Sequence, residues 1–85
     1  MAMTVLYFAS LREGLGVARE TLDQPDGVRV AGDLLAWLRR RGGAWQQLLA
    51  DGRAVRIAVD QQMVDAAAPL HATAEVAFFP PVTGG

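Results

Sequence analysis

The chain has 85 residues, 52% of them hydrophobic and 20% charged, with a formal net charge of −1. This length allows one compact domain and no second core. There is no cysteine, which excludes a disulfide framework, a thiolate metal site and a cysteine nucleophile. A net charge near zero argues against a nucleic acid or a membrane surface as a partner. The longest apolar run near the N-terminus, residues 5–9, is too short for a signal peptide or a membrane span, so we expect a cytoplasmic protein.

The first half of the chain predicts two strands and a helix. Residues 3–9 are apolar on both alternating faces, which is typical of a strand covered on both sides. A short helical turn over residues 10–14 follows, and residues 17–22 alternate imperfectly as a second strand. Apolar side chains at helical spacing then predict an amphipathic helix over residues 30–41, which the glycine pair 42–43 ends.

The second half predicts a helical turn and three short strands. The turn covers residues 45–50, and the strands cover residues 55–59, 63–64 and 74–79. The first and last strands of the chain are the most apolar, so we expect them to be central neighbours in one sheet. They can pair in parallel, because a long crossover that contains the helix separates them. The predicted fold class is therefore α+β, a β-grasp with a mixed sheet and one main helix packed on one face.

Conventional catalytic side chains are missing from the sequence. The lone histidine, His71, lies in a polar loop and is expected to be a solvated surface residue. Ser10 has no neighbouring histidine in the sequence to activate it. The arginine run 39–41 is interpreted as a complement to the end of the helix and as a solvated face. We therefore expect no enzyme activity from the chain on its own, and no metal or cofactor bound by it.

The end of the sequence carries the most specific signal. The proline pair 80–81 stops the ladder pairing of the last strand, since proline has no N–H to donate. The glycine pair 84–85 has no Cβ atoms, so its backbone can pass through a slot too narrow for other residues. We expect residues 1–80 to form the β-grasp domain and residues 81–85 a flexible tail, whose working group is the carboxylate of Gly85. An extended tail reaches roughly 20 Å from Pro80.

The two neighbouring phenylalanines of the last strand, Phe78 and Phe79, must point to opposite faces of the sheet. The side chains that we assign to the inside are Val5, Tyr7, Leu38, Ile57, Val76 and Phe78. Phe79 is then left on the open face together with Phe8 and Met63. Large apolar groups gathered on the outside of a small protein usually mark an interface, so these three are predicted to bind a partner. The alternative is that bulky loops cover them.

The blocks at the two ends of the chain, residues 5–13 and 75–85, follow a known pattern: a strand with a Leu-Arg-Glu turn, and a closing Phe-Pro-Pro-Val-Thr-Gly-Gly. In these blocks the sequence resembles the MoaD family, the small subunits of molybdopterin synthase. A helix block and a strand block between them match more loosely. Two departures lie at turns: Asp60, where that family usually has asparagine, and Thr73-Ala74, where it usually has Gly-Asp.

The resemblance implies a ubiquitin-like sulfur carrier. An adenylating enzyme of the MoeB type would use ATP to activate the Gly85 carboxylate, and a sulfur donor would convert it to a thiocarboxylate. The large synthase subunit, of the MoaE type, would receive the tail in its active site within a heterotetramer. The residues threaded into that site would be Pro81, Val82, Thr83 and Gly84. Sulfur would then pass to a pyranopterin precursor and form the dithiolene of molybdopterin in molybdenum cofactor biosynthesis.

Three alternatives remain open on the sequence alone. One is a sulfur carrier for thiamine thiazole or another thiolated product, against which the Phe-Pro-Pro-Val element of the tail argues. Another is a ubiquitin-like modifier that joins other proteins through Gly85. The third is an interaction domain with no chemistry of its own, which would not need Gly85.

Overall fold

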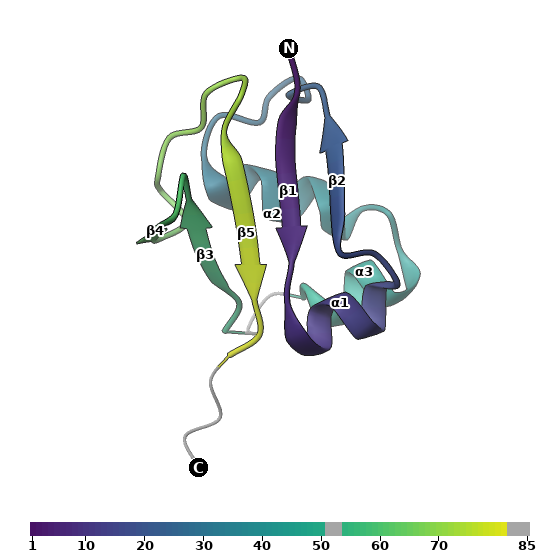
Figure 1. Ribbon diagram of the computed structural model, residues 1–85. Helices are drawn as coiled ribbons and strands as arrows, with labels where there is room; N and C mark the ends of the chain where they lie inside the picture. The colour runs from purple at the N-terminus through teal and green to yellow at the C-terminus, as the bar shows by residue number, and fades with distance from the viewer. Residues whose placement is uncertain (51–53, 82–85) are drawn as a thin grey trace.

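The computed structural model describes residues 1–50 and 54–81, and in this part the chain forms a five-stranded mixed sheet with three helices. The elements in chain order are β1 (Met3–Tyr7), α1 (Ala9–Leu15), β2 (Arg19–Leu22), α2 (Ala31–Arg39), α3 (Gly43–Leu48), β3 (Arg56–Val59), β4 (Gln62–Val64) and β5 (Glu75–Phe79). The sheet order is β2-β1-β5-β3-β4, and Figure 1 shows α2 behind the sheet. We call the opposite face, nearest the viewer in Figure 1, the open face.

The two central strands, β1 and β5, pair in parallel although they come from opposite ends of the chain. Val5 lies opposite Val76, and Tyr7 lies opposite Phe78. The long connection between the two strands contains α2, as a parallel crossover requires. The prediction of a β-grasp, with the first and last strands as central neighbours, is therefore confirmed.

The core lies between the sheet and the helices. The side chains assigned to it from the sequence are all at most 4% exposed: Val5, Tyr7, Leu38, Ile57, Val76 and Phe78. Leu34 and Leu38 of α2 are fully buried, and their spacing of four residues places both on one stripe of the helix. Phe79 is half-buried and points to the open face, because neighbouring side chains of a strand alternate between faces.

The connection between α2 and α3 differs from the prediction. We expected one helix to run to Arg41 and to end at the glycine pair 42–43, but α2 ends at Arg39 and the pair opens α3. Gly42 precedes the first turn of α3, and its φ of 76° lies in the left-handed region that glycine adopts at little cost. The helix therefore ends two residues earlier than predicted, and the helical turn predicted over residues 45–50 is present as α3, which begins at Gly43.

The N-terminus of α2 is capped, although no serine, threonine or asparagine stands there. The carboxylate of Asp33 accepts hydrogen bonds from the backbone N–H groups of Arg29, at 3.0 Å, and Val30, at 3.1 Å. These bonds hold the pKa of Asp33 below its ordinary value. Its negative charge also suits the positive end of the helix dipole. The start of α2 is thus fixed by a residue inside the helix.

The hairpin between β3 and β4 is closed by two residues, Asp60 and Gln61, with φ of 50° and 70°. Positive φ at both positions is what a type I′ turn requires. The Asp60 carboxylate accepts the backbone N–H of Glu75 at 3.0 Å and lies 2.8 Å from Nε2 of His71. These contacts hold the pKa of Asp60 below its ordinary value and tie the hairpin to the start of β5. His71 is exposed, as expected, but it has a carboxylate partner.

Replacing Phe78 by alanine tests which face of β5 supports the fold. Phe78 is fully buried, and its ring stacks on Tyr7 with the centroids 6.1 Å apart. Phe78→Ala is expected to lower the free energy of unfolding by about 3–5 kcal/mol, because it opens a cavity in the core. Urea denaturation followed by circular dichroism measures the loss. Phe79→Ala is the matched control on the open face and is expected to cost clearly less; equal losses would contradict this assignment of the faces.

Candidate functional site: the open face of the sheet

The open face carries a row of residues that crosses all five strands in register. Leu6 of β1 lies opposite Arg19 of β2 on one side and Ala77 of β5 on the other. Ala77 lies opposite Ala58 of β3, which lies opposite Met63 of β4. Directly opposed residues point to the same face of a sheet. The row is therefore apolar from β1 to β4, with an arginine at its β2 end.

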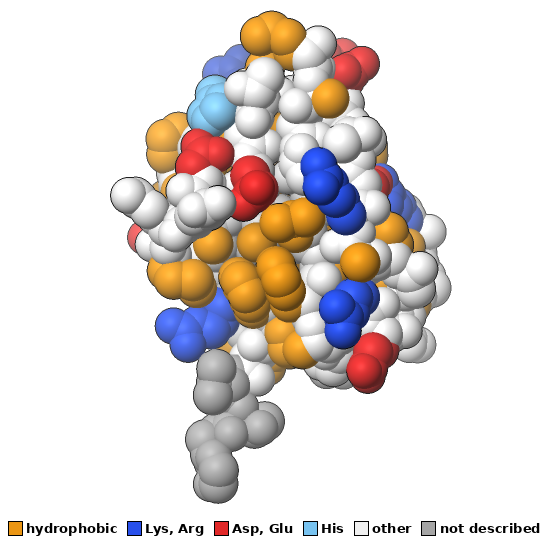
Figure 2. All heavy atoms as spheres, in the orientation of Figure 1, with side chains coloured by type: hydrophobic (Ala, Val, Ile, Leu, Met, Phe, Trp, Pro, Cys, Tyr) orange, Lys and Arg blue, Asp and Glu red, His pale blue; other side chains and the backbone are white. Residues whose placement is uncertain are grey.

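A pair of stacked aromatic rings lies beside this row, at the end of the face where β5 stops. Phe8 follows β1 and Phe79 ends β5, and their ring centroids are 4.7 Å apart with an interplanar angle of 5°. Phe8 is 38% exposed and Met63 is 54% exposed, whereas Ala58 and Ala77 are each only 6% exposed. The two alanines form a floor between larger side chains. Figure 2 shows hydrophobic side chains gathered on this face.

The three residues predicted to contact a partner, Phe8, Met63 and Phe79, all lie on this one face. Within residues 1–50 and 54–81 no loop covers them, since Phe8 and Met63 remain exposed. Gathered apolar side chains on a small protein mark an interaction site. We call this surface the apolar patch; it consists of Leu6, Phe8, Ala58, Met63, Ala77 and Phe79.

The predicted tail begins at the edge of the apolar patch. β5 ends at Phe79, Pro80 is half-buried, and Pro81 is exposed. The prolines end the ladder because they have no N–H to donate. The other residues of the predicted tail, Val82, Thr83, Gly84 and Gly85, lie outside the residues that the structure describes. The tail therefore starts next to the stacked pair of phenylalanines.

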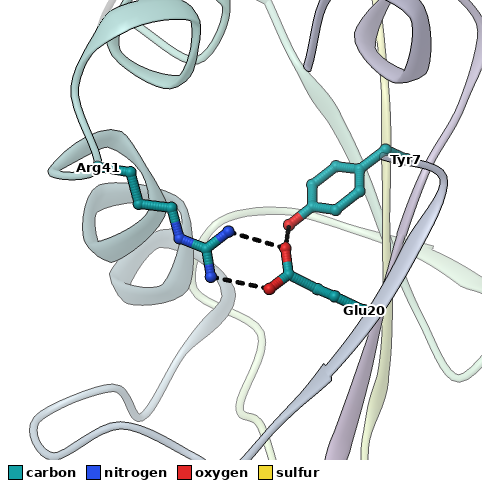
Figure 3. Close-up of polar contacts among 3 residues, drawn as sticks. All are labelled: Tyr7, Glu20 and Arg41. Atoms are coloured by element: carbon teal, nitrogen blue, oxygen red, sulfur yellow. Dashed lines mark hydrogen bonds and ion pairs between the residues drawn. The ribbon is translucent and has the colours of Figure 1, made fainter. Parts of the chain in front are cut away.

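On the helix side, a polar network joins three parts of the fold, as Figure 3 shows. The hydroxyl of Tyr7 donates a hydrogen bond to Oε2 of Glu20 at 2.7 Å. The guanidinium of Arg41 donates to both oxygens of the same carboxylate, at 2.9 Å and 2.8 Å. It also lies over the rings of Trp37 and Trp45, 5.1 Å and 4.5 Å from their centroids. The network connects β1, β2 and the corner between α2 and α3.

The groups of this network set the charge states of one another. Burial alone would raise the pKa of Glu20, but the hydrogen bonds from Arg41 and Tyr7 outweigh it and hold the pKa below its ordinary value. Burial, together with the bond to Glu20, raises the pKa of Tyr7, which stays a neutral donor. Arg41 is exposed just after the end of α2, as interpreted, but the sequence analysis missed its ion pair with Glu20. No local pattern signals its true contact, because Glu20 is 21 positions away in the chain.

The described ranges, 1–50 and 54–81, lack two kinds of feature. They contain no group of three or more histidine, aspartate or glutamate residues that could hold a metal ion. They also contain no helix with the length and apolar character needed to cross a membrane. The open face and the start of the tail are thus the features of this part that point to a function.

Comparison with known proteins identifies the family. Residues 5–85 match the ThiS family. The chain belongs to the ThiS family. This ThiS-family chain is 32% identical over 83 residues to the molybdopterin synthase sulfur carrier subunit of Haemophilus influenzae, covering 98% of this chain and 99% of that protein. It is 38% identical over 87 residues to the protein of the same name from Escherichia coli, covering 95% and 96%. These relatives confirm the resemblance seen in the terminal blocks.

Solved structures share the fold over nearly the whole chain. The small archaeal modifier protein 1 of Haloferax volcanii has a TM-score of 0.76 at 27% identity, with 95% of this chain and 98% of that chain covered. A Pyrococcus furiosus protein named as subunit 1 of a molybdopterin converting factor has a TM-score of 0.74 at 29% identity, with 96% and 99% covered. The ThiS-family chain is therefore a ubiquitin-like β-grasp protein.

The network on the helix side generates a prediction about stability and pH. Glu20→Gln keeps the shape of the side chain but removes its charge, so it is expected to lower the free energy of unfolding at pH 7 by about 1–2 kcal/mol. The pKa of Glu20 is lowered in the folded state from its ordinary value of 4.5. The stabilisation by the charged carboxylate is therefore complete above pH 4.5 and is lost as the pH falls through the folded-state pKa. Urea denaturation of both proteins at pH 7 and pH 3 measures the difference, which is expected to shrink at pH 3.

The matched control is Glu13→Gln, which removes an exposed carboxylate of α1. It is expected to change the stability at pH 7 by no more than a few tenths of a kcal/mol, as is usual for surface substitutions. A loss for Glu20→Gln that is no larger than that of the control would contradict the role given to the network.

Proposed function

We propose that this chain is the sulfur carrier of molybdopterin synthase and that the carboxylate of Gly85 carries the sulfur. The observation that carries the proposal is the likeness to two sulfur carrier subunits of that enzyme, which extends over nearly the whole length of each. The sequence also carries the glycine pair 84–85, whose backbone has no Cβ atoms to hinder its entry into a narrow active site.

The proposed chemistry has three steps. An activating enzyme joins the Gly85 carboxylate to the adenylyl group of ATP and releases pyrophosphate. A sulfur donor then attacks the acyl carbon, so that AMP leaves with one carboxylate oxygen and a sulfur atom takes its place as a thiocarboxylate. Inside the large synthase subunit, this sulfur is transferred to the precursor of molybdopterin, and the chain ends the cycle with its carboxylate restored by water.

The proposed docking surface is the apolar patch together with the tail that begins at its edge. Burial of Phe8 and Phe79 against the large subunit removes exposed aromatic surface from water and holds Pro80 close to the partner. A glycine pair at the end of the tail then lets the backbone enter a narrow active site. Docking and chemistry are thus separated along the chain, with the sheet used for binding and the terminus used for transfer.

One competing function has a specific observation behind it. The structure of the small archaeal modifier protein 1 matches this chain at 27% identity, and its name describes a protein modifier. A modifier would leave its terminal carboxylate in an amide bond to other proteins, whereas a carrier would leave none. Immunoblotting a tagged chain under denaturing conditions separates the two, and we expect no adducts that resist reduction.

The mass of the protein tests sulfur loading directly. Incubation with the activating enzyme, ATP and a sulfur donor is expected to raise the intact mass by about 16 Da, because one sulfur replaces one oxygen. Deletion of Gly85 is expected to abolish the gain. Gly85→Val is the finer variant, and it is expected to block the gain as well, because a β-branched side chain fills a slot shaped for bare backbone. A full mass gain after the deletion would contradict the assignment of Gly85 as the residue that carries the sulfur.

The affinity for the large synthase subunit tests the docking surface. Phe79→Ala is expected to weaken binding by roughly 30-fold, because a buried aromatic anchor contributes about 2 kcal/mol or more. Phe8→Arg is expected to weaken it further by placing a charge in the interface. Isothermal titration calorimetry measures both, with Leu15→Ala on α1 as a control that lies outside the apolar patch. Unchanged affinity of Phe79→Ala would show that the partner binds elsewhere.

A further inference from the structure

Charged side chains stand on the rim of the apolar patch, and the two signs are separated. Arg56 lies opposite Phe79, at the end of the face where β5 stops, and Arg19 lies at the β2 end of the apolar row. Glu75 begins β5 at the other end of the face, and the carboxylate of Asp60 bonds to its backbone N–H. In Figure 2 acidic side chains lie just above the central hydrophobic ones, basic side chains lie to the right and at the lower left, and a further acidic side chain lies at the lower right.

The separation is long compared with a direct ion pair. Residues that share a face repeat every second position, so Glu75 and Phe79 are about 13 Å apart along β5. Apolar side chains fill the space between these two ends of the face. Glu75 and Arg56, which lies opposite Phe79, therefore do not pair with each other within the protein.

The two arginines of the rim have side chains that are available to another molecule. Both Arg19 and Arg56 are exposed, and within residues 1–50 and 54–81 neither guanidinium makes an ion pair or a hydrogen bond. Arg41 shows the contrasting case, since its guanidinium is occupied by the Glu20 carboxylate. Guanidinium groups favour carboxylates as partners because they bind both oxygens at once.

Apolar burial brings two surfaces together but fixes their relative rotation poorly, because the hydrophobic effect has no direction. Charges on the rim of an interface select one rotation and speed the encounter. We propose that Arg19 and Arg56 pair with carboxylates on the large synthase subunit and so orient the carrier with its tail end toward that subunit's active site. The partner surface is then apolar at its centre and acidic beside the point where the tail enters. This inference rests on the proposed function, since it takes the same partner and the same face.

Association kinetics with the purified large synthase subunit test the proposal. Arg56→Glu and Arg19→Glu are each expected to slow association about tenfold at low salt, with the double variant slower still. The wild-type rate is expected to fall as the salt concentration rises, and the double variant to lose most of this dependence. Arg56→Gln is expected to give an intermediate rate, because it removes the attraction without adding repulsion. Thermal melts of each variant show that the fold is kept.

The matched control is Arg29→Glu, which makes the same change of −2 in net charge, from −1 to −3, at an exposed residue before α2. It is expected to change the association rate less than twofold, since it lies off the open face. Equal rates for Arg29→Glu and Arg56→Glu would overturn the proposal, as would an effect of Arg56→Glu on dissociation alone. Phe79→Ala in the same assay tests the docking face separately. If it binds as tightly as the wild type, the docking face proposed above fails, and the orientation by charge fails with it.

Discussion

The parallel pairing of β1 with β5 is the constraint on which the other features depend. It joins the two ends of the chain at the centre of the sheet, with Tyr7 opposite Phe78, and it fixes which side chains of both strands face the helices. Since side chains alternate along extended backbone, Phe8, which directly follows β1, and Phe79, which ends β5, face outward. The core and the apolar patch therefore lie on the two sides of one strand pairing, and Pro80 and Pro81 follow it directly in the chain.

Much of this could be predicted from the sequence because it follows from local patterns. Alternation along residues 74–79 assigns the faces of β5, and the two apolar outer strands indicate that they are central. The proline pair 80–81 indicates where β5 ends, and the structure ends that strand at Phe79. All of these signals lie within a few residues of the feature they predict, and the ThiS-family match supports the same fold.

What could not be predicted depends on contacts between distant residues or on a residue type with two uses. The pair Arg41–Glu20 forms only once β2 and the corner after α2 are side by side, so no spacing rule indicates it. A glycine pair can end a helix or begin one, and only the φ of Gly42 shows that it precedes α3. The cap of α2 by Asp33 is by contrast a local contact over three to four positions, and it was missed because only a serine, threonine or asparagine at the N-cap was considered.

The cluster around Arg41 also determines what tryptophan fluorescence reports on in this protein. The chain has two tryptophans, Trp37 and Trp45, and both flank that guanidinium on the helix side of the sheet. Because both rings lie on the helix side, tryptophan emission reports the packing of the helix layer rather than the open face. The unfolding of the carrier on its own can therefore be followed by the emission of these two tryptophans.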